Sequence, residues 1–465
     1  MKPIHTSQIR PGSPMSLLVW CLLIGSFYLC MPLTAIALEH PQLKPQTGPE
    51  TLTLPAAINL ALQNNAGLRS MDSMQQAKAS RPSQVGALPD PELSFTAASL
   101  PTDTFDRTQE PMTQYKVGIS QGIPFWGKRG LSEDAARFEA QSAEQDVEEF
   151  RFNLKEQVSR SWWELFYLDR SLEVVLKNQT LLRQFVEVAK TKYRVGQGLQ
   201  QDALLAEVEL SKLLDGEIQL KRLKEQETAR LNALLNRDPK TKLQIPLDRN
   251  PMLPTLRPES GLYLLAEQHR PMLESQREQI KAANSRLELA QKDYYPNLMF
   301  GVEYGKRFGK NANGSDRADL ASVKLGISIP IFAGSKQNEA VKQREYEALM
   351  NQSKLESLEI QVRSQVSSMV SDYDSTVEQA LLFSQGIIPQ AKQAVDSMQS
   401  AYRVNKVDFL NLVRMQMTLL NYETQYWRVF THANQTLSKL EALVGNEEIY
   451  VQNDTSPRTK ETNER

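Results

Sequence analysis

The second half of this 465-residue sequence repeats the first. Tyr193-Arg194-Val195 recurs as Tyr402-Arg403-Val404, an offset of 209 residues. Four further anchors keep the same order, with an offset that drifts from 205 to 209: residues 61–64 with 266–269, 91–93 with 296–298, 123–125 with 329–331, and 231–234 with 440–443. Five matches in order indicate a tandem duplication, so the two halves are predicted to fold alike.

The duplication predicts five segments along the chain. Residues 1–37 are expected to be an export signal, 38–237 the first repeat, 238–259 a linker, 260–445 the second repeat and 446–465 a polar tail that frays. The linker is expected to be extended rather than helical because it holds five prolines: Pro239, Pro246, Pro251, Pro254 and Pro258.

The first 37 residues have the order of a cleaved signal peptide. Lys2 and Arg10 precede the apolar stretch 17–29, and residues 35–37 (Ala-Ile-Ala) match the small-x-small pattern of a cleavage site. The alternative is an uncleaved anchor, but a spanning helix needs about 20 apolar residues. No later stretch is as apolar. The mature chain is therefore predicted either to be soluble outside the cytoplasm or to cross a membrane as β-strands.

Each repeat contains two stretches of alternating apolar and small or polar residues, with a polar loop between them. The predicted strands are 91–101 paired with 115–124, and 297–308 paired with 319–330. Their length is close to the 9–11 residues or so that a tilted strand needs to cross a bilayer. The alternative is an ordinary hairpin whose polar face meets solvent.

The remainder of each repeat reads as helix. Residues 54–85 and 261–293 are predicted to be helical, and 128–194 forms one helix of about 100 Å at about 1.5 Å per residue. Its counterpart, 336–404, is interrupted at Gly386 and Pro389. Helices over 201–235 and 408–444 then complete two antiparallel coiled-coil hairpins. The expected apolar seams are Val158, Trp162, Leu165, Leu172 and Leu176 in one helix, and Leu412, Met415, Leu419, Tyr422 and Tyr426 in another.

Composition and motifs argue against nucleic-acid binding, a disulfide framework, a Cys/His metal site and a nucleotide site. Fifty-four basic residues balance 55 acidic ones, so the net charge of −1 predicts no electrostatic grip on nucleic acid. The only cysteines, Cys21 and Cys30, lie in the signal, and the four histidines are scattered, so neither a disulfide framework nor a Cys/His metal site is expected. Residues 122–128 fit G-x-x-x-x-G-K, but Arg129 stands where a P-loop needs Ser or Thr. We therefore predict no catalytic residue, no cofactor and no resident metal.

Five methionines admit two readings. As soft ligands, thioethers bind soft metals, but their helical spacing favours packing in the core. The five are Met71, Met74, Met398, Met415 and Met417.

The order of strand, proline and long helix in each repeat, with Tyr-Arg-Val-Gly-Gln at 193–197, resembles the TolC family of outer-membrane efflux channels. The resemblance spans residues 52–445. Segments 87–93, 110–113 and 121–129 are similar to the branch that accompanies heavy-metal pumps of the RND type. The family implies a mostly α-helical, exported chain. The resemblance further implies a location in the outer membrane with a periplasmic extension, and a periplasmic adaptor and an inner-membrane pump as partners.

The predicted architecture is a homotrimer. Four strands per chain cannot close a barrel, and eight would enclose almost no lumen, whereas twelve strands from three chains leave a water-filled channel. This membrane β-barrel would meet outer-membrane lipid and continue as a tube of coiled-coil helices. Phe125, Trp126 and Phe332 follow strands and are expected at the membrane interface.

The resemblance also implies acidic residues where the helical hairpins turn. Asp202 occupies such a position, Asn411 and Arg414 stand where the second repeat would carry acids, and Asp408 lies one turn earlier. These four residues are the gate candidates. Gly196 and Gly198 are predicted to make the first turn permissive. Arg403, Lys406 or Arg414 are candidate ion-pair partners that would hold the mouth closed.

Three alternatives remain open at the level of sequence. The channel could serve multidrug efflux or type I protein secretion instead of metal export. A protein of another class, a periplasmic adaptor or scaffold, would also use coiled-coil hairpins, although adaptors usually carry one hairpin between compact β-rich modules. The sequence does not identify the transported solute.

Overall fold

The structure is a computed structural model that describes residues 50–246, 253–404 and 406–451. These residues belong to one compact unit, Gln46–Arg465. The expected signal peptide lies outside the described residues, as do part of the linker, Asn405 and the end of the tail. None of the described helices combines the length and the apolar character needed to cross a membrane.

The first repeat begins with strand β1 (Glu50–Thr51) and three short helices, α2 (Leu54–Asn64), α3 (Ala66–Ala79) and α4 (Arg81–Gly86). Strands β2 (Glu92–Ala98) and β3 (Gln114–Ile123) follow, then the long helices α5 (Lys128–Arg194) and α6 (Gln200–Leu234). Asn65 separates α2 from α3 because its side chain caps the new helix, accepting a 3.0 Å hydrogen bond from Leu68 N–H. The helical stretch predicted over 54–85 is therefore confirmed, and it consists of three consecutive helices.

The second repeat follows the same order. After β4 (Leu243–Gln244) come α7 (Glu259–His269), α8 (Pro271–Lys292), β5 (Asn297–Arg307) and β6 (Leu320–Ser328). The predicted interruption near Gly386 is a π-helix, η1 (Leu382–Ile387), between α9 (Gln337–Leu381) and α10 (Ile388–Arg403), and α11 (Phe409–Val444) ends the repeat. The helix break after His269 lies 205 residues beyond the break at Asn65, which is the offset of the repeat.

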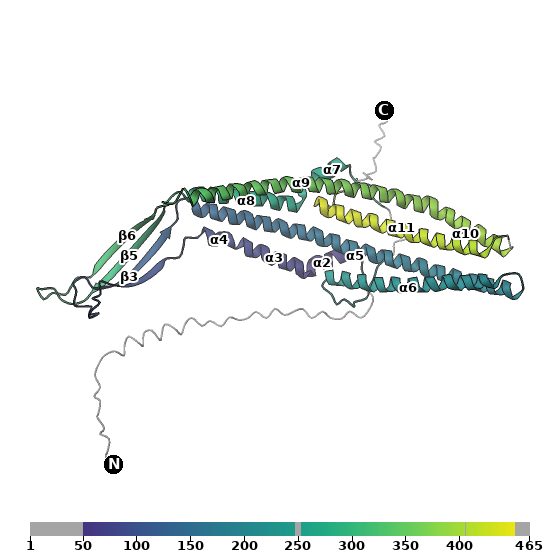
Figure 1. The fold of residues 1–465 in the computed structure, drawn as a ribbon, viewed down its shortest axis with the longest axis horizontal. Helices are drawn as coiled ribbons and strands as arrows, with labels where there is room; N and C mark the ends of the chain where they lie inside the picture. The colour runs from purple at the N-terminus through teal and green to yellow at the C-terminus, as the bar shows by residue number, and fades with distance from the viewer. Residues whose placement is uncertain (1–49, 247–252, 405, 452–465) are drawn as a thin grey trace, which may run out of the picture. The chain divides into compact units, whose positions relative to one another are not determined.

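The four predicted strands are confirmed, and they form one antiparallel sheet in the order β2-β3-β5-β6. The two hairpins pair as expected, with Phe95 opposite Val117 and Val302 opposite Val323. The pairing of β3 with β5, which places Ile119 opposite Val302, joins the two repeats in one sheet. Figure 1 shows β3, β5 and β6 lying side by side.

The register assigns opposite characters to the two faces of this sheet. Side chains alternate along a strand, and paired residues share a face. One face carries exposed apolar side chains: Leu93, Phe95, Tyr115, Val117, Ile119, Phe300, Val302, Tyr304, Val323, Leu325 and Ile327. The other face carries mainly glycine, serine and charged residues. The alternation read from the sequence is confirmed.

Helix α5 is the central element of the helical part, because it packs against α6, α8 and α11. Helix α9 packs against α8 and α11, and α10 pairs with α11 (Figure 1). The seam expected in α5 is correct at Val158, Trp162 and Leu165, which are buried. It is wrong at Leu176, which is 42% exposed, while Val174 and Val175 are buried. A straight helix drifts relative to a strict heptad, so the buried face rotates over 67 residues.

The linker and tail contain more structure than the sequence suggested. Strand β4, inside the linker, pairs in parallel with β1. The tail begins with a buried Ile449, whose carbonyl accepts a 2.9 Å hydrogen bond from Arg257 N–H. Both segments lie against the middle of the long helices, where Leu52, Leu243 and Leu256 pack in the core. The expectation that the tail frays from residue 446 is therefore wrong up to Val451.

Candidate functional site

The first hairpin turns between α5 and α6 through two glycines with different tasks. Gly196 has φ +73°, and the following N–H, from Gln197, donates to Lys192 O over 2.8 Å. This is the left-handed ending typical of a helix C-terminus. At Gly198 a Cβ atom would lie 2.9 Å from Lys192 Cβ, so the turn has no room for a side chain. Both glycines serve the turn that positions Asp202.

The second hairpin closes in the same way. Lys406 N–H donates to Ala401 O over 2.9 Å, and both residues lie 209 positions after their counterparts in the first turn. Asn405, the position equivalent to Gly196, lies outside the described residues. The repeat therefore preserves the backbone closure of the turn although neither glycine is retained.

The structure brings Asp202 and Asp408 together at the two turns. Asp202 lies half-buried in the first turn of α6, and Asp408 is the exposed residue immediately before α11. Burial raises the pKa of Asp202, and the negative charge of Asp408 raises it further. Within one chain the two carboxylates therefore repel each other.

Lys192 and Tyr402 complete this cluster, and sequence reasoning missed both. Lys192 Nζ donates to Tyr402 O over 2.6 Å and lies 4.1 Å from the centre of the tyrosine ring. The ring also packs on Phe409, at 5.1 Å between centroids. Burial together with the charges of Asp202 and Asp408 raises the pKa of Tyr402 to about 12. The contact ties the first hairpin to the second.

The other gate candidates follow Asp408 within the first two turns of α11. Asn411 and Arg414 are exposed on α11. In the described part of the chain, neither acid forms an ion pair with Arg403, Lys406 or Arg414, so the pairing expected from sequence is absent within one chain. Lys192 is the cation whose charge acts on Asp202. The sequence did not predict this role of Lys192, because Lys192 lies before the turn and only the folded hairpin places it close to the acids.

The aromatic residues that follow the strands differ in their surroundings. Phe125 stacks on Tyr295 of the second repeat with ring centroids 4.6 Å apart. Trp126 is 73% exposed and Phe332 is 67% exposed. Phe125 therefore helps to hold the junction of sheet and helices. Trp126 and Phe332 are exposed on the surface of the chain.

The lysine of the P-loop-like motif has a structural role. Lys128 Nζ lies 3.1 Å from Asp293 Oδ1 and donates to Tyr295 O and Asn297 Oδ1 over 3.1 and 3.0 Å. All three partners belong to the second repeat, at the entry to β5. The ammonium group is buried among these oxygens, so it is not presented to a phosphate.

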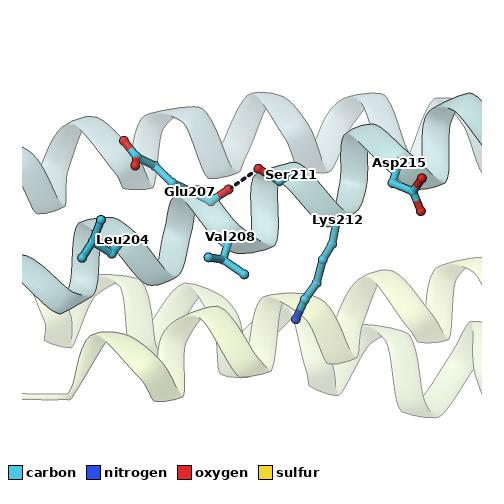
Figure 2. A pocket seen from close by; sticks show the side chains of 6 residues that line it. All are labelled: Leu204, Glu207, Val208, Ser211, Lys212 and Asp215. Atoms are coloured by element: carbon cyan, nitrogen blue, oxygen red, sulfur yellow. Dashed lines mark hydrogen bonds between the residues drawn. The ribbon is translucent and has the colours of Figure 1, made fainter.

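Helix α6 carries an open recess along one of its faces. Figure 2 shows the six side chains that line it: Leu204, Glu207, Val208, Ser211, Lys212 and Asp215. Leu204 and Val208 are exposed apolar residues. Glu207 forms an ion pair with Lys190, with 2.7 Å between Lys190 Nζ and Glu207 Oε1. Ser211 Oγ donates a hydrogen bond to the backbone carbonyl of Glu207. The recess belongs to a single helix and holds no arrangement of catalytic groups.

The described residues contain no group of three or more His, Cys, Asp or Glu side chains placed to hold a metal ion. The methionines follow the packing interpretation at four of five positions. Met71, Met398, Met415 and Met417 pack against core clusters, whereas Met74 is exposed. The thioethers are therefore distributed among separate clusters rather than gathered around one point.

The repeat, the sheet and the paired hairpins agree with a family comparison. The sequence matches the outer membrane efflux protein family over residues 57–237 and 262–446, one stretch in each repeat. Together these stretches make up most of the chain. The chain belongs to the outer membrane efflux protein family. The resemblance found in the sequence is thereby confirmed, and because members of this family are efflux proteins, the chain is not an enzyme.

Relatives of this efflux protein include the cobalt-zinc-cadmium resistance protein CzcC of Cupriavidus metallidurans. It is 22% identical over 411 residues, which are 86% of this chain and 92% of the relative. The outer membrane protein VceC of Vibrio cholerae superposes with a TM-score of 0.72 at 18% identity, covering 85% of this chain and 97% of VceC. The open-state outer membrane channel MtrE of Neisseria gonorrhoeae has a TM-score of 0.70 at 15% identity, covering 85% and 89%. The solved structures establish the shared fold.

Proposed function

We propose that three copies of this chain form a channel through which solutes leave the cell across the outer membrane. The observation that carries the proposal is the four-stranded sheet. Within the described residues, β2 and β6 each pair with a single neighbour, and one face of the sheet is apolar and exposed. Twelve strands from three copies would pair both edges and turn the apolar face to lipid.

The helices offer edges of the same kind. Helix α6 packs mainly against α5, and the recess lined by Leu204 and Val208 remains uncovered. The other edge of the helical array, on α9 and η1, carries exposed Tyr346, Leu349, Met350, Leu381 and Leu382. A ring of three chains joins unlike edges head to tail, so these two surfaces would meet between neighbours. The result would be a helical tube that continues the strands into the periplasm.

This channel would act with a periplasmic adaptor and an inner-membrane pump of the RND type. The name of CzcC, a cobalt-zinc-cadmium resistance protein, supports heavy-metal export as the use of the channel. A strain lacking the chain should then lose tolerance to cobalt, zinc and cadmium. Unchanged metal tolerance would instead favour multidrug efflux or protein secretion.

The hairpin turns would form the periplasmic mouth. In a three-fold ring Asp202 and Asp408 would bring six carboxylates around one axis, with Asn411 and Arg414 at the rim. The contact of Lys192 with Tyr402 would hold the two hairpins of each chain together. The charge repulsion already present within one chain would keep the closed mouth only weakly favoured, so that a docking partner can open it.

Membrane extraction followed by crosslinking tests the channel. We expect the mature protein to resist a carbonate wash, to crosslink as a trimer in mild detergent and to conduct ions in a planar bilayer. An adaptor without an anchor would be released by carbonate. Protein that is extracted in this way, or that crosslinks only as a monomer, contradicts the proposal.

A further inference from the structure

The polar face of the sheet carries an uneven distribution of charge. By the register, this face in the described strands holds five charged residues: Glu92, Lys116, Glu303, Arg307 and Lys324. Glu92 lies at the end nearest the helices and Arg307 at the end nearest the loops. The other three lie close together on neighbouring strands β3, β5 and β6.

These three side chains form a connected band. Glu303 bonds to Lys324 on β6, and its other oxygen lies 3.6 Å from Lys116 Nζ on β3. The Glu303 side chain is only 10% exposed, whereas the two lysines are 26% and 56% exposed. The negative charge is therefore covered and the positive charges face outward from the sheet.

Glycines make this arrangement possible. A Cβ atom at Gly118, directly opposite Glu303, would lie 2.6 Å from Glu303 Cγ. Only glycine leaves space for the glutamate to lie flat across the neighbouring strand. Glu303 is thus held against the sheet, while the flexible stems of Lys116 and Lys324 extend over it.

We propose that Lys116, Glu303 and Lys324 form a selectivity band that favours anions inside the strand section of the channel. The inference rests on the proposed function, because it requires the polar face to line the lumen. Two lysines and one glutamate give a charge of +1 per chain, and three chains would give +3 around the lumen. At about 0.1 M salt such charges act over about 10 Å, so the band influences ions that pass close to the polar face.

The band narrows the class of solute that passes most readily. Fixed charge of one sign in a confined passage concentrates counter-ions and repels ions of the same sign. The favoured solutes are inorganic or organic anions, and a metal cation passes more readily when an anionic ligand compensates its charge. The acids at the helical turns, Asp202 and Asp408, would instead attract cations. The two ends of the channel would therefore differ in their preference between anions and cations.

Reversal potentials of the purified protein in a planar bilayer under a potassium chloride gradient test the band. In Lys116→Gln/Lys324→Gln we expect the permeability ratio of chloride to potassium to fall, on the order of threefold. In Glu303→Gln the ratio should rise. Lys306→Gln is the matched control: Lys306 is the charged residue that the opposite face of the described strands carries, and its loss should leave the ratio unchanged.

Each outcome separates the band from the channel itself. If the parent conducts and neither lysine nor glutamate variant changes the ratio, the three side chains are a structural ion-pair ladder and the inference is wrong. If Lys306→Gln changes the ratio as much as the double variant, the polar face does not line the lumen. A parent that inserts without conducting overturns the proposed function, and the band with it. Crosslinking of each variant as a trimer confirms that it has assembled.

Discussion

At the scale of single residues, duplication has kept the amino acid while folding has changed its environment. Tyr193 and Tyr402 are equivalent positions of the two repeats, yet Tyr193 is 49% exposed and Tyr402 is 7% exposed. The difference arises because Lys192 and Phe409 cover only the second tyrosine. Sequence comparison of the repeats identified the turns, but it could not distinguish the buried member of the pair from the exposed one.

Asp202 provides a prediction at this scale. Its folded-state pKa is raised above the ordinary 3.8, so the folded chain binds the proton more tightly than the unfolded chain. The contribution of Asp202 to the free energy of unfolding should therefore be greatest below its unfolded pKa and should be lost as pH rises through its folded pKa. Asp202→Asn should raise the melting temperature at neutral pH and remove this dependence, as measured by thermal unfolding in detergent.

The control for this prediction is Glu225→Gln, which replaces an exposed carboxylate of the same helix α6 outside the recess. This variant should keep the pH dependence of the free energy of unfolding that Asp202 causes. A lower melting temperature of Asp202→Asn at neutral pH would show that the Asp202 carboxylate stabilises the turn, contrary to the repulsion inferred here.

At the scale of elements, the two long helical arms differ in continuity. Helix α5 runs unbroken for 67 residues, whereas the corresponding arm is divided by η1. Gly386 lies inside the π-helix, and Pro389 follows at the start of α10, where its missing N–H removes a backbone hydrogen bond. The sequence located this interruption correctly, because glycine and proline act locally. The sequence did not predict that the interruption is a π-helix, and this π-helix packs against α11.

Two glycines, one just before α6 and one inside it, provide a prediction with an internal control. Gly198→Ala should destabilise the first turn by about 1–2 kcal/mol, because its Cβ would overlap Lys192. Gly216→Ala, in the middle of α6 with open space around it, should stabilise the helix by about 0.5–1 kcal/mol. Melting temperatures should therefore move in opposite directions. A shift of the same sign in both variants would mean that helix propensity, rather than the turn, controls stability.

At the scale of the whole molecule, the repeats are fastened at the junction of sheet and helices. The β3–β5 pairing, the stacking of Phe125 on Tyr295 and the bonds of Lys128 all cross between repeats. Farther along, Gln416 donates to Asn178 over 2.7 Å in a buried contact between α11 and α5. The two halves thus form one unit rather than two domains joined by a linker.

Lys128→Met should loosen this unit. The change removes two hydrogen bonds and an ion pair to the second repeat, and each bond to a charged donor contributes about 1.5–3 kcal/mol. We expect a lower melting temperature and faster proteolysis between β3 and α5. Lys177→Met, on an exposed face of the same helix, is the control. Equal melting temperatures of parent and Lys128→Met would mean that Lys128 does not stabilise the junction, and that the pairing of the strands holds the repeats together.

The sequence by itself determined the duplication, the four strands, the long helices and the positions of the turns, because periodicity, proline and glycine act over a few residues. It also predicted the family, since many such features occur in a fixed order. Only the tertiary structure decided the β3–β5 pairing, the packed start of the tail, and the roles of Lys192, Tyr402 and Lys128. These depend on contacts between segments about 170 to 210 residues apart, where no local pattern specifies the partner. Long-range packing alone brings such residues together.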